Sequence, residues 1–376
     1  MKPIRILVLI LCACFVPVAS GQQPAGKCYN SWAEFHRYNM WRWNRCEKVL
    51  NTKNVKSLSL KWSYATGGRV YSSPAVASGV VYIGSNGGNV YALNASTGAK
   101  LWSYTTGNAV ESSPAVASGM VYVGSEDGNV YALKASTGAL LWSYATGGGV
   151  DSSPAVANGV VYVGSWDYNV YALNASTGAL LWSYTTGGGV DSSPAVANGV
   201  VYASSEDGNA YALNASTGAL LWSVPGDYGY SSPAVTNGVV YVGGSNHMDA
   251  LNASTGALLW SYRTGSVVDS SPAVANGVVY FGEWNTEVYA VNASTGTLLW
   301  SLWVWENIVE SSFAVANGVV YIGFGPNMCG LDAKTGARLW YTFDPPTQGV
   351  VSSLAVADGV VYGSSWDGGV YAWGLK

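Results

Sequence analysis

Tryptophan recurs along this chain at an almost constant spacing, and the residues around each copy repeat as well. The successive separations are 40, 40, 40, 40, 38, 40 and 40 residues. The repeated tryptophans are Trp62, Trp102, Trp142, Trp182, Trp222, Trp260, Trp300 and Trp340. A self-similar unit of this length is typical of solenoids and propellers, in which one supersecondary unit is copied and stacked. The chain therefore contains eight copies of one small folding unit.

Each unit divides into four stretches with strand character, bounded by turn residues. In the copy that starts at Asp151 they read "SSPAVA", "VVYVGS", "NVYALN" and "LLWSY". Asn158 and Gly159 join the first two stretches and accept the positive φ angles of a type I′ hairpin. The phrase "NASTG" joins the last two, where Asn174 can bond the backbone two residues on and Gly178 can adopt a left-handed conformation.

We therefore predict an all-β fold, an eight-bladed β-propeller with four antiparallel strands per blade. The density of Val, Tyr, Gly and Asn-Gly excludes a helical solenoid. The repeats begin with an isolated fourth strand, "LKWSY" at residues 60–64, and end after a third strand, "VYAWGLK". The N-terminal strand is expected to complete the last blade and close the ring, because closure removes an open sheet edge.

Two repeated residue types have expected structural roles. The proline of "SSPAVA" is placed in the innermost strand, an edge strand that can spare a backbone N–H. The eight repeated tryptophans are placed between neighbouring blades, where each docks one blade on the next. Burial of so large a side chain stabilises the fold by roughly 2–3 kcal/mol.

The chain is predicted to have three parts: a signal peptide at residues 1–21, a basic and aromatic cap segment at residues 22–56, and the propeller at residues 57–376. Lys2 and Arg5 precede an apolar run and then small residues, a pattern typical of secretory signals. We expect an exported protein, secreted or periplasmic, with no transmembrane segment. An outer-membrane lipoprotein is the alternative, because the sequence around Cys14 loosely resembles a lipobox.

The segment before the repeats differs from them in charge. From Lys27 to Lys61 it has eight basic residues and two acidic ones. We expect it to pack against the ring as a cap, with the docking of a partner as the alternative. Cys28 and Cys46 could form a disulfide in an oxidising compartment, which leaves Cys329 without a partner.

Comparison of the eight copies divides the expected propeller into two faces. The turn after the first strand and the turn before the fourth strand keep one length in every copy, and we name the face that carries them the constant face. The other connections vary: the nine residues between the tryptophan and the next "SS" become eight, ten and eleven after Trp222, Trp300 and Trp340. These connections form the variable face, which we expect to bind, since binding loops vary on a rigid scaffold.

Charge follows the same division. From Arg69 onward there are 19 acidic and 7 basic residues, and most of the acids belong to the variable face. The residue before "SS" is acidic in five of the eight copies, and aromatic residues occur in the nearby loops. The candidate binding residues are Glu111, Asp151, Asp191, Asp269, Glu310, Tyr71, Tyr230, Trp166, Trp366, Trp303 and Trp305, and the loops between second and third strands add Glu126, Glu206 and Glu283.

An acidic, aromatic-lined surface of this kind attracts a cation, calcium or a basic peptide segment. It repels nucleic acid, which is therefore not an expected partner. The alternative is that the acids only keep a repetitive propeller soluble. The two histidines, His36 and His247, lack a visible nucleophile partner, so the sequence indicates no hydrolase site.

The stretch from Gly330, "GLDAKTGARLW", and the phrase "ALNASTGALLW" resemble the tryptophan-docking motif of the PQQ-like repeat. With "SSPAV" and "GVVYVGS" in the same register, the resemblance covers about residues 57–376. The family contains quinoprotein dehydrogenases, which hold pyrroloquinoline quinone and calcium at one end of the channel. It also contains non-enzymatic propellers similar to BamB, a scaffold of the outer-membrane protein assembly machinery. The fold alone does not choose between these groups.

A quinoprotein resemblance implies a tryptophan beneath the quinone, a disulfide of adjacent cysteines above it, oxygen ligands on calcium and an aspartate base. Trp166 or Trp366 could form the floor and Asp151 or Asp191 the ligands, but the propeller has no adjacent cysteines. We therefore favour a monomeric, non-catalytic propeller, without catalytic residues or a resident metal, that binds a protein or small-molecule ligand through its variable face. A dehydrogenase that uses pyrroloquinoline quinone and calcium to oxidise an alcohol or sugar is the alternative.

Overall fold

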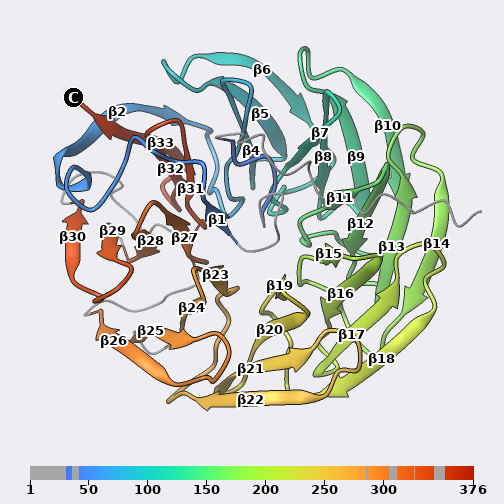
Figure 1. Cartoon of the computed structure of the whole chain (residues 1–376). Helices are drawn as coiled ribbons and strands as arrows, with labels where there is room; N and C mark the ends of the chain where they lie inside the picture. Colours follow the sequence, from blue (N-terminus) through green and yellow to red (C-terminus); the bar gives the residue numbers. More distant parts are fainter. Residues whose placement is uncertain (1–30, 36–41, 285–286, 305–310, 326, 343–351) are drawn as a thin grey trace, which may run out of the picture.

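In the computed structural model of the chain, each repeat unit forms a four-stranded antiparallel sheet, and the eight sheets surround a common axis (Figure 1). The structure describes residues 31–35, 42–284, 287–304, 311–325, 327–342 and 352–376. The prediction of an all-β, eight-bladed β-propeller is confirmed. Among the described residues, the helical element is a short 3₁₀ helix, η1 (Val55–Ser57).

The blades are numbered in chain order, and their strands are given from the axis outward. Blade 1 contains β3 (Ala75–Ala77), β4 (Val80–Ser85), β5 (Asn89–Asn94) and β6 (Lys100–Thr105). Blade 2 contains β7 (Ala115–Ala117), β8 (Met120–Gly124), β9 (Asn129–Lys134) and β10 (Leu140–Ala145). Blade 3 contains β11 (Ala155–Ala157), β12 (Val160–Gly164), β13 (Asn169–Asn174) and β14 (Leu180–Thr185). Blade 4 contains β15 (Ala195–Ala197), β16 (Val200–Ser204), β17 (Asn209–Asn214) and β18 (Leu220–Pro225).

The second half of the ring has the same order. Blade 5 contains β19 (Ala234–Thr236), β20 (Val239–Gly244), β21 (His247–Asn252) and β22 (Leu258–Arg263). Blade 6 contains β23 (Ala273–Ala275), β24 (Val278–Gly282), β25 (Glu287–Asn292) and β26 (Leu298–Trp303). Blade 7 contains β27 (Ala314–Ala316), β28 (Val319–Phe324), β29 (Asn327–Asp332) and β30 (Arg338–Tyr341), and β1 (Trp43–Asn44) runs parallel to β27. Blade 8 contains β31 (Ala355–Ala357), β32 (Val360–Ser364), β33 (Gly369–Leu375) and β2 (Leu58–Ala65).

The turns of the constant face follow from their residues. Asn158 and Gly159 have φ angles of 51° and 77°, as a type I′ hairpin requires. In the "NASTG" turn, Oδ1 of Asn174 accepts hydrogen bonds from the backbone N–H groups of Ser176 and Thr177 at 3.0 and 3.1 Å. Gly178 has a φ of 72°, a conformation that glycine adopts without strain.

The prolines lie just outside the innermost strands, so their predicted placement was wrong by one residue. Pro154 directly precedes β11, whose three residues pair with β12. The innermost strand begins at the next residue in every blade, also in blades 7 and 8, where Phe313 and Leu354 take the place of the proline, so the missing N–H does not set this boundary.

The N-terminal strand closes the ring as predicted. Strand β2 pairs antiparallel with β33, and the register places Leu60 opposite Trp373 and Tyr64 opposite Val370. The end of the repeat region thus lies beside its beginning (Figure 1), and blade 8 is built from both. No blade among the described residues lacks its outer strand.

The repeated tryptophans contact the following blade. The indole N–H of Trp182 donates to the carbonyl of Ala215, in the "NASTG" turn of blade 4, at 3.0 Å. Six other repeated tryptophans make the same bond to the next blade, Trp62, Trp102, Trp142, Trp222, Trp260 and Trp300. The turn glycine leaves room for the ring, since a Cβ on Gly178 would lie 2.7 Å from Trp142. The phrase "NASTGALLW" therefore builds a turn and an interface between blades together.

The two serines of each "SS" also have separate tasks. The first bonds both within its own blade and to the next one: Oγ of Ser152 accepts from the N–H of Gly164 at 2.9 Å and donates to the carbonyl of Ser192 at 2.9 Å. The second bonds to the next blade, because the N–H of Ser153 donates to Oγ of Ser193 at 3.0 Å. This second bond recurs at all eight interfaces and forms a closed ring near the axis, which we name the serine ring: Ser73, Ser113, Ser153, Ser193, Ser232, Ser271, Ser312 and Ser353.

The described parts of the N-terminal segment lie against the innermost strands. Trp32 exchanges two backbone hydrogen bonds with Val76 of blade 1, and the carbonyl of Ala33 accepts from Val116 of blade 2. On the other side of the axis, the carbonyl of Arg42 accepts from the N–H of Val315 in blade 7. These bonds occupy backbone groups at the inner edges of the sheets, which would otherwise be open.

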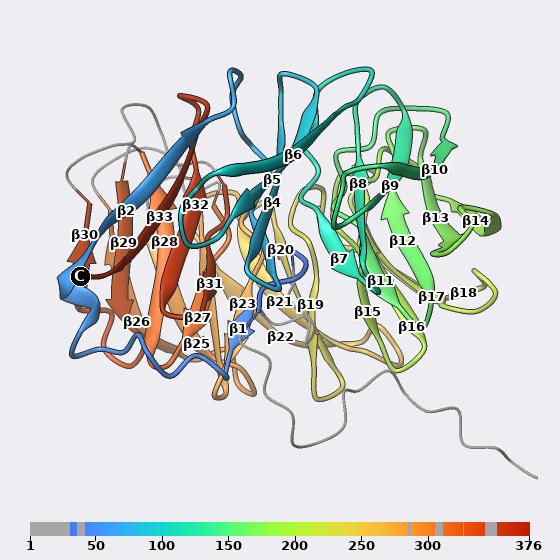
Figure 2. The same cartoon turned by 90° about the horizontal axis from the view of Figure 1, so that it is seen from above.

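Arg42 holds this segment in place. Its buried guanidinium donates to the carbonyls of Phe313, Phe35 and Leu354. Burial lowers the pKa of Arg42 to about 9. Beyond β1, the chain passes along the constant face, where Glu47 accepts from the N–H of Gly359, and η1 leads into β2 (Figure 2).

Several predictions concern residues outside the described ranges. The signal peptide at residues 1–21, the lipidation of Cys14 and the position of Cys28 are among them, so the boundaries of the cap segment stay a prediction. Cys46 is disulfide-bonded, and its pairing with Cys28 stays a prediction as well. Within the described part of the chain, no helix has the length and hydropathy of a membrane span.

Candidate functional site

On the variable face, neighbouring loops are tied together by backbone hydrogen bonds. The N–H of Glu126 donates to the carbonyl of Ala109 at 2.9 Å, and the N–H of Trp166 donates to Gly149 at the same distance. In each case a residue between the second and third strands bonds to the loop that leads into its own blade. This arrangement brings Glu126, Trp166 and Glu206 close to the acidic residues that precede "SS".

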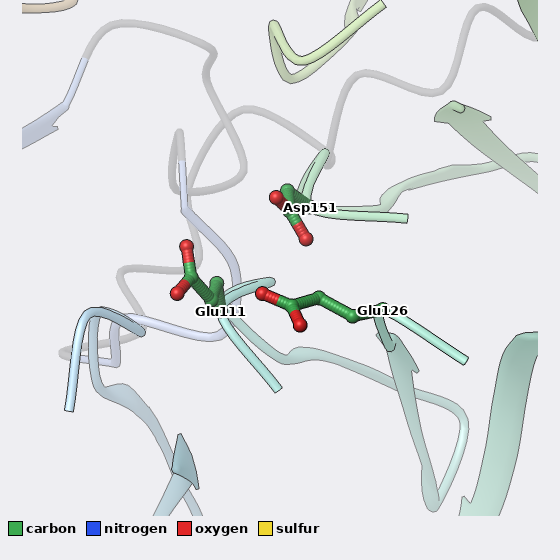
Figure 3. A group of neighbouring side chains, drawn as sticks. All are labelled: Glu111, Glu126 and Asp151. Atoms are coloured by element: carbon green, nitrogen blue, oxygen red, sulfur yellow. The ribbon is translucent and has the colours of Figure 1, made fainter. Parts of the chain in front are cut away.

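Three carboxylates meet where blades 2 and 3 adjoin. One oxygen each of Glu111, Glu126 and Asp151 lies within 4.8 Å of the other two, and all three side chains are half-buried. Figure 3 shows the carboxyl group of Glu126 projecting between the other two. Asp191 and Glu206 of blade 4 continue the group, and we name these five residues the acidic cluster.

The charges of the acidic cluster disfavour one another. Burial and then the charges of Glu111, Asp191 and Glu126 raise the pKa of Asp151 to about 7. Burial and the charge of Glu206 raise the pKa of Asp191 to about 6, against a hydrogen bond from Trp166 that lowers it. Such shifts concentrate at functional sites, because a site that must receive a cation is strained without one.

Asn86 belongs to this group and was missed by the sequence analysis. Its amide Nδ2 donates to Oε1 of Glu111 at 2.7 Å. The remaining oxygen, Oδ1 of Asn86, is buried without a hydrogen-bond partner, as are Oδ1 of Asp151 and Oδ1 of Asp191. The signal was present in the register, since Asn86 occupies in blade 1 the place of Glu126 in blade 2.

Exposed aromatic residues lie next to the acidic cluster. Tyr230 is 59% exposed, and the charges of Glu206 and Asp191, together with partial burial, raise the pKa of its hydroxyl. Trp166 is also exposed, and its backbone N–H bonds to the carbonyl of Gly149 in the loop that leads to Asp151. Across the axis, Tyr71 and Trp366 pack against each other with ring centroids 6.1 Å apart. The predicted aromatic residues of blades 3, 5 and 8 therefore border the variable face.

Other candidates lie apart from the acidic cluster. Asp269 leads into blade 6, and burial alone raises the pKa of its carboxyl group. Trp303 is exposed at the end of β26. Trp305 and Glu310 lie outside the described residues. Among the described residues, the predicted ring of acids is thus concentrated at blades 2 to 4.

Glu283 lies in the loop between the second and third strands of blade 6, as predicted, but its side chain is not available to a ligand. Glu283 is buried, and its Oε2 accepts from the N–H groups of Gly265 and Ser266 at 2.7 and 3.0 Å. It occupies the place of Ser165 in blade 3, where a buried side chain supports the adjacent loop. The exposed residue at this turn is Trp284, which is 48% exposed and matches Trp166 in register.

The acidic cluster has the donor chemistry of a hard cation site. Carboxylate and amide oxygens are the preferred ligands of calcium, and three oxygens this close can share one ion. The quinone of the alternative hypothesis fits less well, because it carries carboxylates of its own and would lie against five acidic side chains. Cys329, a buried thiol of blade 7, lies far from the acidic cluster around the ring.

Comparison with known proteins identifies the family of the chain. The family model described as outer membrane protein assembly factor BamB matches residues 41–151, 127–229 and 225–376. Among curated proteins, no sequence matches the chain significantly.

Several solved structures share the fold. BamB from Moraxella catarrhalis is 18% identical, with a TM-score of 0.73 over 84% of this chain and 99% of that chain. A quinohemoprotein alcohol dehydrogenase from Pseudomonas putida HK5 is 17% identical, with a TM-score of 0.78 over 92% and 80%. A europium-containing methanol dehydrogenase is 15% identical, with a TM-score of 0.78 over 92% and 98%. Both groups of the PQQ-like repeat family are therefore similar in fold.

The repeat pattern, the docked tryptophans and the family match from residue 41 to the C-terminus agree, and the chain belongs to the BamB family of PQQ-like repeat β-propellers.

Proposed function

We propose that the chain is a non-catalytic binding propeller whose acidic cluster holds a basic segment of a partner polypeptide. The observation that carries the proposal is the approach of Glu111, Glu126 and Asp151 to within 4.8 Å on the face with variable loops. Like charges held this close are unfavourable in the free protein, and a cationic side chain relieves that repulsion when it binds. The family description, an assembly factor, is consistent with a protein partner.

The aromatic residues suit the same partner. Trp166 and Tyr230 lie beside the acidic cluster with exposed rings, and such rings attract the guanidinium or ammonium group of a neighbouring basic residue. An extended segment with lysine or arginine and apolar residues between them would use both features. The partner chemistry proposed is therefore basic and amphipathic.

A binding titration tests the proposal. The probe is a fluorescent peptide that alternates lysine or arginine with apolar residues, and the readout is its anisotropy at low and high salt. The triple variant Glu111→Gln, Glu126→Gln, Asp151→Asn is expected to weaken binding by at least about tenfold, and salt is expected to weaken wild-type binding.

The matched control is Asp332→Asn on the constant face. Asp332 holds the turn position that Asn174 holds in blade 3, so this variant removes one carboxylate and keeps the turn. Its affinity for the peptide is expected to equal that of the wild type. Equal affinity in the triple variant would refute the proposed site.

The second candidate, a quinoprotein dehydrogenase, rests on the oxygens of Asn86, Glu111, Glu126 and Asp151. These residues would hold calcium, which would supply a positive charge beside a bound quinone. Calorimetric titration with calcium, then with pyrroloquinoline quinone, and a dye-linked alcohol oxidation assay test it. Calcium-dependent quinone binding with turnover would favour this candidate over the scaffold.

We further propose that the protein is exported to the periplasm or beyond. The charged start, apolar run and small residues of positions 1–21 support this, as does a family described by an outer-membrane process. N-terminal sequencing of the protein recovered from its host is expected to begin after residue 21. Recovery of the intact N-terminus from the cytoplasm would contradict export.

A further inference from the structure

Five of the eight interfaces between blades contain a pair of tyrosine rings, and the interface between blades 6 and 7 contains neither tyrosine. Between blades 2 and 3, Tyr144 from β10 packs against Tyr171 from β13 with centroids 5.7 Å apart. Four further interfaces have the same pair, Tyr64 with Tyr91, Tyr104 with Tyr131, Tyr184 with Tyr211, and Tyr262 with Tyr289. Between blades 6 and 7 the two positions are Leu302 and Cys329, so both rings are absent.

The remaining exceptions keep a ring at the interface. Between blades 4 and 5, Tyr228 enters from the preceding loop and is buried beside Asp249. Between blades 7 and 8, Tyr371 is kept and packs against Trp373 at 5.5 Å. The positions of the pair between blades 4 and 5 are Val224 and Asp249, so both tyrosines are absent there as well, but the buried Tyr228 fills the space. Between blades 6 and 7, among the described residues, the space is left partly open.

The missing rings leave a cavity of about 190 Å³. Its lining is almost entirely apolar and aromatic: Leu302, Trp303, Val304, Phe324, Cys329 and Tyr341, with Arg338. Burial raises the pKa of the Cys329 thiol to about 12, so this side chain stays protonated and offers an uncharged wall. Trp303 and Arg338 are exposed, which places the entrance at the outer strands.

The size of the cavity selects the ligand. An apolar cavity of about 150 Å³ is large enough to stay dry and to bind benzene. The cavity between blades 6 and 7 therefore has room for one aromatic ring with a small substituent. It is too small for a drug-sized molecule, whose pockets begin at roughly 300 Å³.

Arg338 gives the cavity its polarity. Its guanidinium carbon lies 5.3 Å from the centre of the Tyr341 ring, and no hydrogen bond or ion pair to another described residue occupies it. The same position is leucine in most copies, for example Leu180 in blade 3. A guanidinium at the rim of an apolar cavity matches a carboxylate attached to a ring.

We propose that the cavity between blades 6 and 7 binds a small aromatic carboxylate, with its ring between Leu302 and Cys329 and its carboxylate on Arg338. This site is separate from the acidic cluster and does not depend on the function proposed for it. The ring of the ligand takes the place that the tyrosine pair fills at five other interfaces.

Titration with three small probes tests the proposal. Benzoate has the ring and the charge, benzyl alcohol has the ring alone, and acetate has the charge alone. In calorimetric or ligand-observed NMR titrations, benzoate is expected to bind one site, with benzyl alcohol at least about tenfold weaker and acetate undetected. Arg338→Gln is expected to weaken benzoate to the level of benzyl alcohol.

Two variants fill the cavity from opposite sides. Leu302→Tyr and Cys329→Tyr each restore one ring of the pair, so each is expected to abolish benzoate binding while thermal stability is kept or raised. If one variant fails to fold, the other still tests the site. Lys100→Gln is the control for Arg338, because Lys100 holds the same register position in blade 1, and it is expected to leave binding unchanged.

The outcomes are distinct. Benzoate binding that is lost in the filled variants and weakened in Arg338→Gln supports the site. Undetectable benzoate binding to the wild type overturns it. Binding that persists unchanged in a folded, filled variant also overturns it, because the ligand would then lie elsewhere.

Discussion

The backbone N–H of Ser353 donates a hydrogen bond of 3.0 Å to Oγ of Ser73, which lies 280 residues earlier in the chain. This bond is the last of the serine ring, and it has the same form as the seven bonds between consecutive blades. The propeller is thus closed twice, at the periphery by β2 and β33 and near the axis by the serines. A rigid closed ring is what holds the loops of the variable face in fixed relative positions.

Ser73→Ala is expected to lower the free energy of unfolding by about 1–3 kcal/mol, because the buried N–H of Ser353 loses its acceptor. Ser193→Ala, which removes an acceptor between blades 3 and 4, is expected to cost the same. Chemical denaturation followed by tryptophan fluorescence measures both. If Ser73→Ala were as stable as the wild type while Ser193→Ala was destabilised, the serine ring would be open between blades 8 and 1.

The pH dependence of stability is expected to reflect the acidic cluster. The pKa of Asp151 is raised to about 7 in the folded protein, above its unfolded value, so the folded state binds more protons between about pH 4 and 7. Its contribution is fully present below the unfolded pKa and is lost as the pH rises through 7. The free energy of unfolding is expected to change between pH 5 and pH 8 in the wild type. In Asp151→Asn this change is expected to be smaller by about 1–2 kcal/mol, after allowance for solvent screening.

The control for this measurement is Asp332→Asn, whose pH dependence is expected to match the wild type. A wild-type protein that is more stable at pH 8 than Asp151→Asn would contradict the repulsion assigned to the acidic cluster.

Blade 5 contains a tyrosine–aspartate hydrogen bond in which the two residues occupy different positions from those in blade 3. In blade 3, the hydroxyl of Tyr171 donates to Asp167 at 2.6 Å, whereas in blade 5 the hydroxyl of Tyr228 comes from the loop and donates to Asp249 at 2.5 Å. Asp249 is 6% exposed, and its second oxygen has no hydrogen-bond partner. Tyr228→Phe is therefore expected to destabilise by about 2–3 kcal/mol, more than Tyr171→Phe. Equal losses in urea denaturation would contradict this reading.

Arg42 is expected to be the main anchor of the N-terminal segment. Arg42→Met removes the donor of three carbonyl groups and is expected to cost about 2–4 kcal/mol. Limited proteolysis is expected to cleave the variant between residues 31 and 58 faster than the wild type. Arg45→Met, which changes an exposed arginine of the same segment, is the control. Equal cleavage rates for Arg42→Met and the control would show that the segment is held by its backbone bonds alone.

The sequence predicted the blades, the hairpin turns and the closure by β2, because each is encoded by local residues such as Asn158, Gly159 and Gly178 that recur in register. It did not predict the serine ring, whose bonds join atoms about 40 residues apart and depend on the angle between blades. One signal of its importance was available in the sequence. The two serines are kept in all eight copies, even where the proline that follows them is replaced by Phe313 or Leu354.

The site was predicted less completely for the same reason. The residues before "SS" were predicted to form a binding surface, which stays a proposal, and the grouping of the described acids at blades 2 to 4 depends on which loops touch. The burial of Glu283 was not predicted, because the sequence does not distinguish an acidic residue that supports a loop from one that is exposed on it. The cavity beside Cys329 was not predicted, since an absent ring becomes visible only when the neighbouring blade is placed against it.

Hydrogen–deuterium exchange with the basic peptide bound is the most direct test of the proposed binding surface. The loops that carry the acidic cluster, at residues 107–112, 125–128, 148–152, 187–192 and 205–208, are expected to exchange more slowly in the complex, while the constant-face turns at 94–98 and 174–178 stay unchanged. Protection of the constant-face turns, or protection of neither face at saturating peptide, would contradict the account.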